Sequence, residues 1–320
     1  MNNNEELNYV YKLYDKYNIN EEDFDNNINL SDNFNLYVNN KWQKKNPIPD
    51  KHISWGSFQV LNEETKQKLK KLVENEYNVN DLENINILYS TGMDEDKINN
   101  DDIKPLEKYL KELNEIKTKK DLFKYLSKLY KLGLTGIFGI GPSEDAKNSI
   151  LNVPHLYGGG LGLPDRDYYF DDDKKEIRLK YFKYIKKLLF LLNYEEKKAH
   201  KITEDILKIE TQIAYVTYTR EERRDPEKRY NKMTLEELIK IAPNIEWELF
   251  FEGLTNIKIT YLIVDNPKYF KTLSNMFENI SLEIWKNLFT YKIVKSSASY
   301  LSERFINHIF FFYIKELSGQ

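Results

Sequence analysis

Hydrophobic residues recur along most of this chain at intervals of three and four, which is the spacing of an amphipathic α-helix. After Ser57, apolar residues at this spacing alternate with Lys and Glu and predict a long helix with one solvent-exposed face. The same pattern predicts further helices at Phe34–Trp42, Ile85–Gly92, Pro105–Ile116 and Asp121–Lys131. Pro47 and Pro49 end the predicted helix Phe34–Trp42 and impose an extended segment before the helix that follows Ser57.

Helices resume from Asp173. Two long apolar stripes, Tyr181–Leu192 and Ile202–Val216, predict neighbouring helices that bury facing sides. Thr234 precedes Glu237 by three residues, which is the spacing of a capping box at a helix start. Three final helices are expected to begin at Pro267, Ser281 and Ser302.

The region between these helical parts has a different character. Leu134–Ile140 is β-branched and aromatic and predicts a strand, which Asn148–His155 can pair with as a hairpin. Pro154–Tyr169 is dense in Gly and Pro and predicts a shaped loop, and Thr260–Val264 predicts a short strand. The expected fold is therefore mainly α, a multi-helix lobe with a small β-hairpin.

The two ends of this pattern set the expected domain limits. Residues 1–30 are rich in Asn, Asp and Glu and predict a loosely ordered leader whose only periodic segment is Leu7–Tyr17. The folded region is expected to cover residues 31–320, which is long enough to bury a large core.

Composition excludes several classes of partner. The 48 basic and 51 acidic residues are interleaved, so no long-range field favours nucleic acid or an anionic membrane. The longest apolar runs, Leu188–Leu192 and Ile309–Ile314, are far shorter than a membrane span, and the N-terminus lacks the apolar core of a signal peptide. Cysteine is absent, which favours a reducing compartment, so a cytoplasmic location is expected.

A metal or catalytic site is difficult to build from these residues. The four histidines are His52, His155, His200 and His308, and none is followed by Glu, so no His-Glu-x-x-His zinc helix is present. His200 and Glu204, four residues apart, could give a metal two ligands, but a surface pair on a helix is the stronger interpretation. We therefore predict no catalytic residue, no metal ligand and no cofactor-binding residue.

Two other patterns suggest binding chemistry and are better explained by structure. The glycine clusters Gly136–Gly141 and Gly158–Gly162 lack the residues of a phosphate-binding loop, and tight turns are expected there. The acidic runs Asp94–Asp96 and Asp171–Asp173 lack a calcium-loop pattern and are interpreted as solvated helix ends.

One segment is dense in groups that form ion pairs. It runs from Glu221 to Lys232 and contains Arg223, Arg224 and Arg229. Because a guanidinium can bind a carboxylate through two nitrogens, we expect this segment to be a structural latch between helices.

Several segments resemble the N-terminal half of the neprilysin (M13) family of zinc metalloendopeptidases, and they occur in the family's order. They are Asn33–Trp42 with Pro47–Pro49, Trp55–Phe58, Asp145–Ser149, Leu161–Tyr169, Arg224–Pro226 with Tyr230–Thr234, Tyr300–Ser302 and Leu317–Gln320. The nine residues from Leu161 to Tyr169 are very close to the family's Leu-Gly-Leu-Pro-Asp-Arg-Asp-Tyr-Tyr motif. The resemblance implies that residues 31–320 are an M13-type N-terminal region.

The resemblance also implies where the chemistry lies. The family's zinc is held by a His-Glu-x-x-His helix and a Glu-x-x-x-Asp helix in its C-terminal half, and no residue here matches either motif. Family arginines that contact the substrate's C-terminus occur just before and shortly after the Trp-Gly-Ser-Phe segment. Ser54 and Asn62 occupy those places here.

Two hypotheses follow from the resemblance. The first is the non-catalytic part of a zinc peptidase, inactive alone, whose partner is the missing catalytic half or an oligopeptide. It predicts an apolar surface where that half packs, and Phe310–Phe312 is the candidate. The second is a peptide-binding or regulatory lobe that works without hydrolysis.

Overall fold

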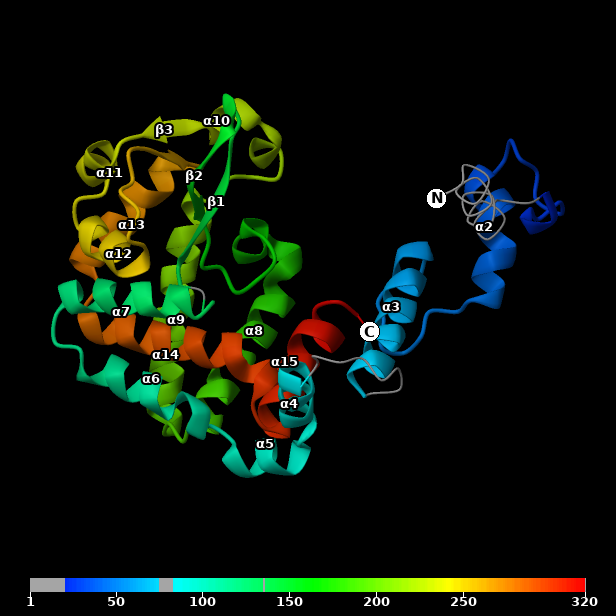
Figure 1. The fold of residues 1–320 in the computed structure, drawn as a ribbon, viewed down its shortest axis with the longest axis horizontal. Coiled ribbons are helices and arrows are strands. Elements are labelled where there is room, and N and C mark those ends of the chain that lie inside the picture. The colour runs from blue at the N-terminus through cyan, green and yellow to red at the C-terminus, as the bar shows by residue number, and fades with distance from the viewer. Residues whose placement is uncertain (1–20, 75–82, 135, 320) are drawn as a thin grey trace. The chain divides into compact units, whose positions relative to one another are not determined.

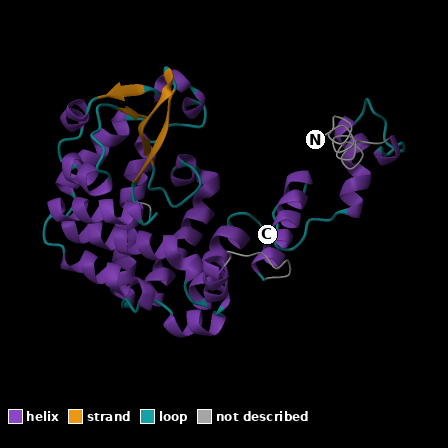
Figure 2. Ribbon diagram, in the orientation of Figure 1, coloured by secondary structure: helices purple, strands orange, loops and turns teal. Residues whose placement is uncertain are grey.

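The computed structural model describes residues 21–74, 83–134 and 136–319, which divide into two compact units. Unit 1 is the chain up to Ile87, and unit 2 runs from Leu88 to Gly319. Helices predominate and strands are confined to one part of the structure (Figure 2), so the predicted mainly α fold is confirmed. The predicted helix Leu7–Tyr17 lies outside the described residues, and the domain boundary near residue 31 stays a prediction.

Residues 21–74, the first described stretch of unit 1, contain two helices and a short 3₁₀ turn. The turn is η1 (Glu21–Asp23), and the helices are α2 (Phe34–Lys45) and α3 (Ser57–Val73). Asn33 caps α2 by accepting a hydrogen bond from the Leu36 N–H, and the helix continues one turn beyond the predicted end. The buried carboxylate of Asp25 accepts hydrogen bonds from the Asn40 side chain (2.5 Å) and the Asn27 N–H (3.2 Å), which ties the preceding segment to α2.

Helices α2 and α3 have no buried residue. On α3, Phe58 is 87% exposed, Leu61 51% and Leu69 54%. These side chains follow one another at helical spacing, so they form a single apolar face. The predicted long helix after Ser57 is confirmed, and within the described residues 21–74 nothing covers its apolar side.

Helix α4 (Glu83–Met93) spans the division between the units, and unit 2 contains the other helices that the structure describes (Figure 1). They are α5 (Glu95–Asp101), α6 (Lys104–Glu115), α7 (Lys119–Lys131), α8 (Lys175–Leu191), α9 (Glu196–Val216), α10 (Pro226–Arg229), α11 (Leu235–Ile241), α12 (Trp247–Leu254), α13 (Pro267–Asn279), α14 (Leu282–Ser297) and α15 (Glu303–Ile309). The predicted helices in this part of the chain are confirmed, whereas α5, α10 and α12 were not predicted.

The predicted helix starts are also confirmed. Thr234 and Glu237 form a capping box at α11, with each side chain bonded to the other residue's N–H. Pro267 is the first residue of α13, and Ser281 and Ser302 are the N-cap residues of α14 and α15. Asp94 caps α5, so the acidic run there is a helix end, as predicted.

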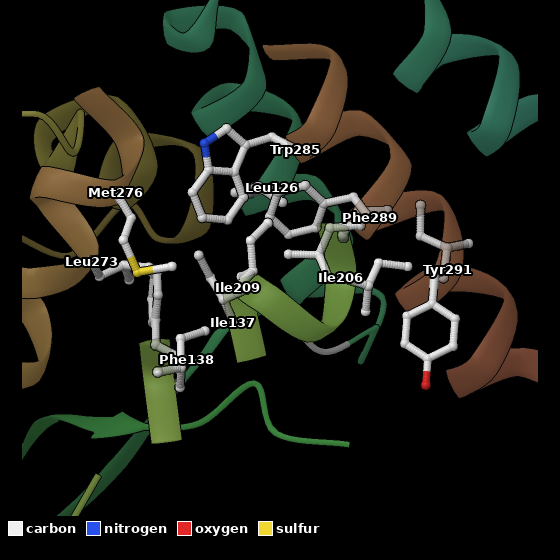
Figure 3. Close-up of a cluster of buried hydrophobic side chains, with 14 of the residues drawn as sticks. Leu126, Ile137, Phe138, Ile206, Ile209, Leu273, Met276, Trp285, Phe289 and Tyr291 are labelled. Carbon is white, nitrogen blue, oxygen red and sulfur yellow. The ribbon is translucent and has the colours of Figure 1, made fainter. Parts of the chain in front are cut away.

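The core of unit 2 forms around α9. This helix packs against α8, α13 and α14, and α14 also packs against α6. Figure 3 shows Ile206 and Ile209 of α9 among Leu126 of α7, Met276 of α13 and Trp285 of α14. These apolar side chains are almost completely removed from water, which is the main stabilising contribution to the lobe.

A small sheet lies at one end of the helical lobe (Figure 2). Its strands, in the order β1-β2-β4-β3, are β1 (Phe138–Asp145), β2 (Asn148–Gly158), β4 (Leu262–Val264) and β3 (Asn231–Met233). β1 and β2 form an antiparallel hairpin, as predicted, but β1 begins at Phe138 rather than Leu134 and continues to Asp145. β4 joins β2 in parallel. The sheet is larger than predicted because Asn231–Met233 pairs with β4. Asn231 and Lys232 were expected only as the end of the latch.

The segment proposed from the sequence as a bare surface is a π-helix, η6 (Phe310–Glu316). Phe310 and Phe311 are about half exposed, at 50% and 52%. The prediction was wrong for Phe312, which is buried, because its ring packs against Tyr181 (5.5 Å) and Tyr184 (4.9 Å). In the part of the chain that the structure describes, no helix is both long and apolar enough to cross a membrane.

Candidate functional site

The Gly- and Pro-rich loop between β2 and α8 is held by buried hydrogen bonds. The hydroxyl of Tyr169 accepts hydrogen bonds from the N–H groups of Gly162 (3.0 Å) and Leu163 (3.2 Å). It donates in turn to the carboxylate of Glu210 on α9 (2.8 Å). One tyrosine hydroxyl therefore joins the loop backbone to the central helix of the lobe.

Glu210 is fully buried, and its carboxylate accepts a hydrogen bond from a second hydroxyl. Tyr181 of α8 donates to its carboxylate at 3.0 Å, and the hydroxyl oxygens of Tyr181 and Tyr291 are 2.9 Å apart. Burial, together with the negative charge of Glu210, raises the pKa of Tyr169 and Tyr181 well above its ordinary value. These tyrosines therefore remain protonated donors at any physiological pH.

The carbonyl groups of the same loop face other donors. Lys292 Nζ donates to the Gly160 carbonyl, and the Tyr313 hydroxyl donates to the Gly162 carbonyl, both at 2.8 Å. Gly160 has a φ of +85°, and a Cβ there would lie 2.8 Å from the Ile137 carbonyl oxygen, so only glycine fits. The N–H groups of Gly162 and Leu163 already have a partner in Tyr169, so they are not free to bind an anion. The segment after Gly158 is an irregular loop, and the tight turn predicted at Gly136–Gly141 was wrong, because Phe138–Gly141 belongs to β1.

The predicted latch lies beside this loop. Asp165 is buried and its carboxylate contacts Arg220 Nε (2.8 Å) and Arg223 (2.6 Å). Burial opposes ionisation, but these guanidiniums and the Arg166 N–H hold the pKa of Asp165 below its usual value. Arg229 pairs with Asp265, next to the start of α13. The latch is confirmed, although it joins loops to one another rather than two helices.

A second carboxylate centre lies at the tip of the hairpin. Asp145 is almost fully buried and accepts hydrogen bonds from the hydroxyls of Tyr230 and Tyr261, both at 2.8 Å, and from the Lys147 N–H at 2.9 Å. These hydrogen bonds favour the ionised carboxylate and lower the pKa of Asp145. The bond from the Lys147 N–H has the largest effect. Lys147 also pairs with Glu227 at 3.0 Å. The hairpin tip is therefore fixed to the latch.

Comparison with known proteins identifies the family of this chain. The N-terminal model of peptidase family M13 matches residues 30–320. The chain belongs to peptidase family M13. Endothelin-converting enzyme 1 of Cavia porcellus is 30% identical over 288 residues, a match covering 85% of this chain and 38% of that protein.

Solved structures of M13 proteins have the same fold. Mycobacterium tuberculosis zinc metalloprotease Zmp1, in complex with an inhibitor, superposes with a TM-score of 0.88 at 23% identity, over 93% of this chain and 47% of the other. PepO from Lactobacillus rhamnosis superposes with a TM-score of 0.78 at 18% identity, over 92% and 47%. The chain thus spans less than half the length of the M13 proteins it matches.

The two M13 substrate-contact positions predicted from the sequence lie in unit 1. Ser54 is exposed ahead of α3, and its hydroxyl accepts a hydrogen bond from Gln59 Nε2 at 3.3 Å. Asn62 is exposed in the second turn of α3. Both side chains are accessible, and their role as substrate contacts stays a prediction.

The residues described do not form the zinc site of an M13 enzyme. His200 lies 3.5 Å from Glu204 as an exposed pair, and His52 lies 3.7 Å from Glu63. His308 is buried and stacks on Tyr184. Within residues 21–74, 83–134 and 136–319, no three His, Cys, Asp or Glu side chains converge as metal ligands would. We therefore derive no chemical step through zinc.

Sequence reasoning did not identify Glu210, Asp145 or Lys292 as important. The Leu161–Tyr169 and Asp145–Ser149 motifs of the M13 family contain the only sequence signal for two of these centres. They mark the loop that Glu210 holds and the carboxylate of Asp145 itself.

Proposed function

We propose that this chain is the non-catalytic helical lobe of a neprilysin-type zinc metallopeptidase and does not hydrolyse peptides on its own. In this proposal the zinc and the catalytic residues belong to a separate part of the M13 fold, and the lobe encloses the peptide. Family membership supports the proposal, as does the absence of a His-Glu-x-x-His sequence from the 320 residues.

One observation carries the proposal: α3 lies within the M13 match but buries none of its 17 residues. In proteins most of the stability of a helix comes from packing its apolar face rather than from helix propensity. Phe58, Leu61 and Leu69 form such a face. We infer that the zinc-binding part of the peptidase covers it.

The same reasoning applies to the half-exposed Phe310 and Phe311 of η6 in unit 2. Ile306, one turn earlier on α15, is 40% exposed. Together these side chains make a second apolar surface, of the kind that marks protein interfaces. We propose that it too is buried in the complete enzyme.

Ser54 and Asn62 remain candidate contacts to an oligopeptide in this proposal. Both side chains are uncharged, so they can offer hydrogen bonds to a peptide but no ion pair to its terminal carboxylate. Substitution by Ala is therefore expected to weaken peptide binding by less than about tenfold for each residue.

Hydrogen exchange of the purified chain tests the proposal. We expect the amides of α3 to exchange rapidly, while those of α14, which has many buried residues, exchange slowly. The chain should also hold no stoichiometric zinc and show no chelator-sensitive cleavage of a quenched fluorogenic peptide. Strong protection of α3 in the chain alone would contradict the proposed covering surface, and chelator-sensitive cleavage would contradict the proposed inactivity.

A pair of substitutions makes this test sharper. Phe58→Ser should change the stability of the chain alone by less than about 0.5 kcal/mol, because Phe58 is 87% exposed. Phe289→Ser, at a buried site on α14, should cost more than about 3 kcal/mol. Only Phe58→Ser should fold normally and still weaken association with a zinc-binding M13 part.

The second candidate is a lobe that binds peptides without hydrolysis, favoured by the well-formed core of unit 2. The nucleotide sequence after the codon for Gln320 distinguishes the two candidate functions. An open reading frame that continues beyond the codon for Gln320 and encodes His-Glu-x-x-His would exclude the second candidate. A stop codon there would favour it.

A further inference from the structure

Strand β1 is one edge of the small sheet. The strand order is β1-β2-β4-β3, so among the described strands β1 pairs with β2 on one side and with none on the other (Figure 1). Within the described part of the chain, β1 packs mainly against β2. Its residues 139–141 are partly exposed and residues 142–144 are exposed. A ligand can therefore reach this strand from solvent.

The prolines of the hairpin show which backbone groups face the open side of β1. Pro142 lies opposite Pro154, and neither has an N–H, so the two do not form a hydrogen-bonded pair. Bonded and non-bonded pairs alternate along an antiparallel ladder, so the pair of Ile140 and Leu156 is also non-bonded. The Leu156 carbonyl agrees with this, because it accepts a hydrogen bond from the Asp265 N–H on the β4 side (2.8 Å). The N–H and C=O of Ile140 therefore point away from β2.

Tyr130 occupies the first position of the same edge. Phe138 lies two residues before Ile140, so its backbone groups also point outward. The Tyr130 hydroxyl donates to the Phe138 carbonyl and accepts from the Phe138 N–H at 3.4 Å. A side chain thus supplies the two hydrogen bonds that a neighbouring strand would make. At Ile140 none of the described residues supplies them, which leaves an edge position ready for pairing.

The side chains beside this position leave space. Gly139 and Gly141 flank Ile140, and they lie opposite Tyr157 and His155 on one face of the sheet. An added Cβ at Gly141 meets nothing within 4 Å. The rings of His155 and Tyr157 stack with their centres 5.9 Å apart. A large side chain from an added strand can therefore lie across Gly141 and contact these rings, as aromatic residues do beside glycines at sheet edges.

We propose that the open side of β1 binds an extended segment of an oligopeptide by strand addition. The N–H and C=O of Ile140 pair with one peptide residue, and the next residue places an apolar side chain, preferably aromatic, over Gly141. Pro142 interrupts the row of N–H groups, which favours a short peptide over a long strand of another protein. The choice of a peptide rests on the proposed function, but the binding itself needs neither zinc nor hydrolysis.

Amide exchange and chemical shifts, measured by ¹⁵N NMR on the full chain, test the inference. In the chain alone, the Ile140 amide should exchange much faster than those of Gly139 and Gly141, which are bonded to β2. The probe is the pentapeptide Thr-Val-Phe-Val-Thr, acetylated and amidated at its ends. We expect it to shift the Ile140 resonance saturably and to slow exchange there.

Two altered peptides identify the groups that the strand recognises. Methylation of both valine nitrogens removes the N–H that would bond to the Ile140 carbonyl and should weaken binding about tenfold or more. Replacement of phenylalanine by alanine keeps the peptide backbone and should weaken binding by less, about threefold to tenfold, because only the side-chain contact over Gly141 is lost.

Substitutions in β1 separate its backbone from its side chains. Ile140→Pro removes the outward N–H without a bond to β2, as Pro142 already does, and should weaken binding about tenfold or more. Ile140→Ala is the matched control, because it shortens the side chain but keeps the N–H, and binding should stay within about threefold of the wild type. Gly141→Val fills the space over the glycine and should abolish the preference for phenylalanine over alanine. Circular dichroism melting checks that each variant folds.

The results that would overturn the inference are distinct from failure of the proposed function. Equal binding of the methylated peptide, or no response of Ile140 to the pentapeptide, would exclude strand addition at β1. Slow exchange of Ile140 in the chain alone would show that the edge is already paired, within the chain or with a second copy. The methylated peptide decides even if Ile140→Pro does not fold. A chain that held zinc and cleaved peptides would refute the proposed inactivity and leave the response of Ile140 unchanged.

Discussion

Replacing Tyr169 with Phe removes one oxygen atom from the interior of unit 2 and should disrupt the loop more than the size of the change suggests. The hydroxyl of Tyr169 makes three hydrogen bonds, to the N–H groups of Gly162 and Leu163 and to the carboxylate of Glu210. All four residues are buried, so water does not replace the lost oxygen without a rearrangement. The phenylalanine ring itself fits the site.

The magnitude follows from the groups left without a partner. A buried donor or acceptor that loses its partner costs about 1–3 kcal/mol, and more for a charged group. Glu210 keeps the hydrogen bond from Tyr181, so its loss is partial. Two orphaned N–H groups and a weakened carboxylate site give an expected loss of about 3 kcal/mol. For a domain of this size, that lowers the melting temperature by roughly 6–12 °C.

Tyr168→Phe is the matched control, because Tyr168 is the neighbouring residue of the same motif and is only partly buried. Its removal of a hydroxyl should change stability by less than about 0.5 kcal/mol. Urea unfolding followed by circular dichroism measures both variants. If Tyr169→Phe falls within about 1 kcal/mol of Tyr168→Phe, the three hydrogen bonds do not hold the loop and the reasoning fails.

Three further predictions concern the same lobe. Asp165→Asn should lower the free energy of unfolding by about 2 kcal/mol at pH 7. The pKa of Asp165 is held below its usual 3.8, so the difference in stability between the variant and the wild type should shrink as the pH falls through that lowered value. Urea unfolding from pH 7 to pH 3 measures this change. Burial lowers the pKa of His308 from 6.5, so the unfolded wild-type chain takes up a proton before the folded one and the wild type loses stability between pH 7 and pH 5. His308→Gln should make this loss smaller. Equal pH profiles of the variant and the wild type would contradict the prediction. Gly160→Ala should lower the free energy of unfolding by about 3 kcal/mol. Gly92→Ala on α4 is the control, because an added Cβ there meets nothing within 4 Å, and it should be neutral or stabilise the chain by about 0.5–1 kcal/mol. Thermal melting measures both variants.

The elements that the sequence predicted correctly are those fixed by local chemistry. The capping box of Thr234 and Glu237 and the N-cap of Ser281 depend on residues within one turn, so their patterns are complete in the sequence. The helix α12 was missed because Trp247–Leu254 is apolar on most sides and short, and such a segment has no clear helical period. Strand β3 was missed because its three residues pair with β4, about 30 residues later, and local patterns do not encode that contact.

The candidate site was harder to predict because its charges become important only through burial. Glu210 lies on the apolar stripe of α9, and Lys292 and Lys295 belong to a helix with several other polar residues. In the sequence each looks like an ordinary helical charge, which is usually solvated. Packing of α9 against α8 and α14 brings Glu210 beside the hydroxyl of Tyr181, which in turn lies 2.9 Å from that of Tyr291. That grouping is a property of the assembled lobe, and no local pattern in the sequence encodes it.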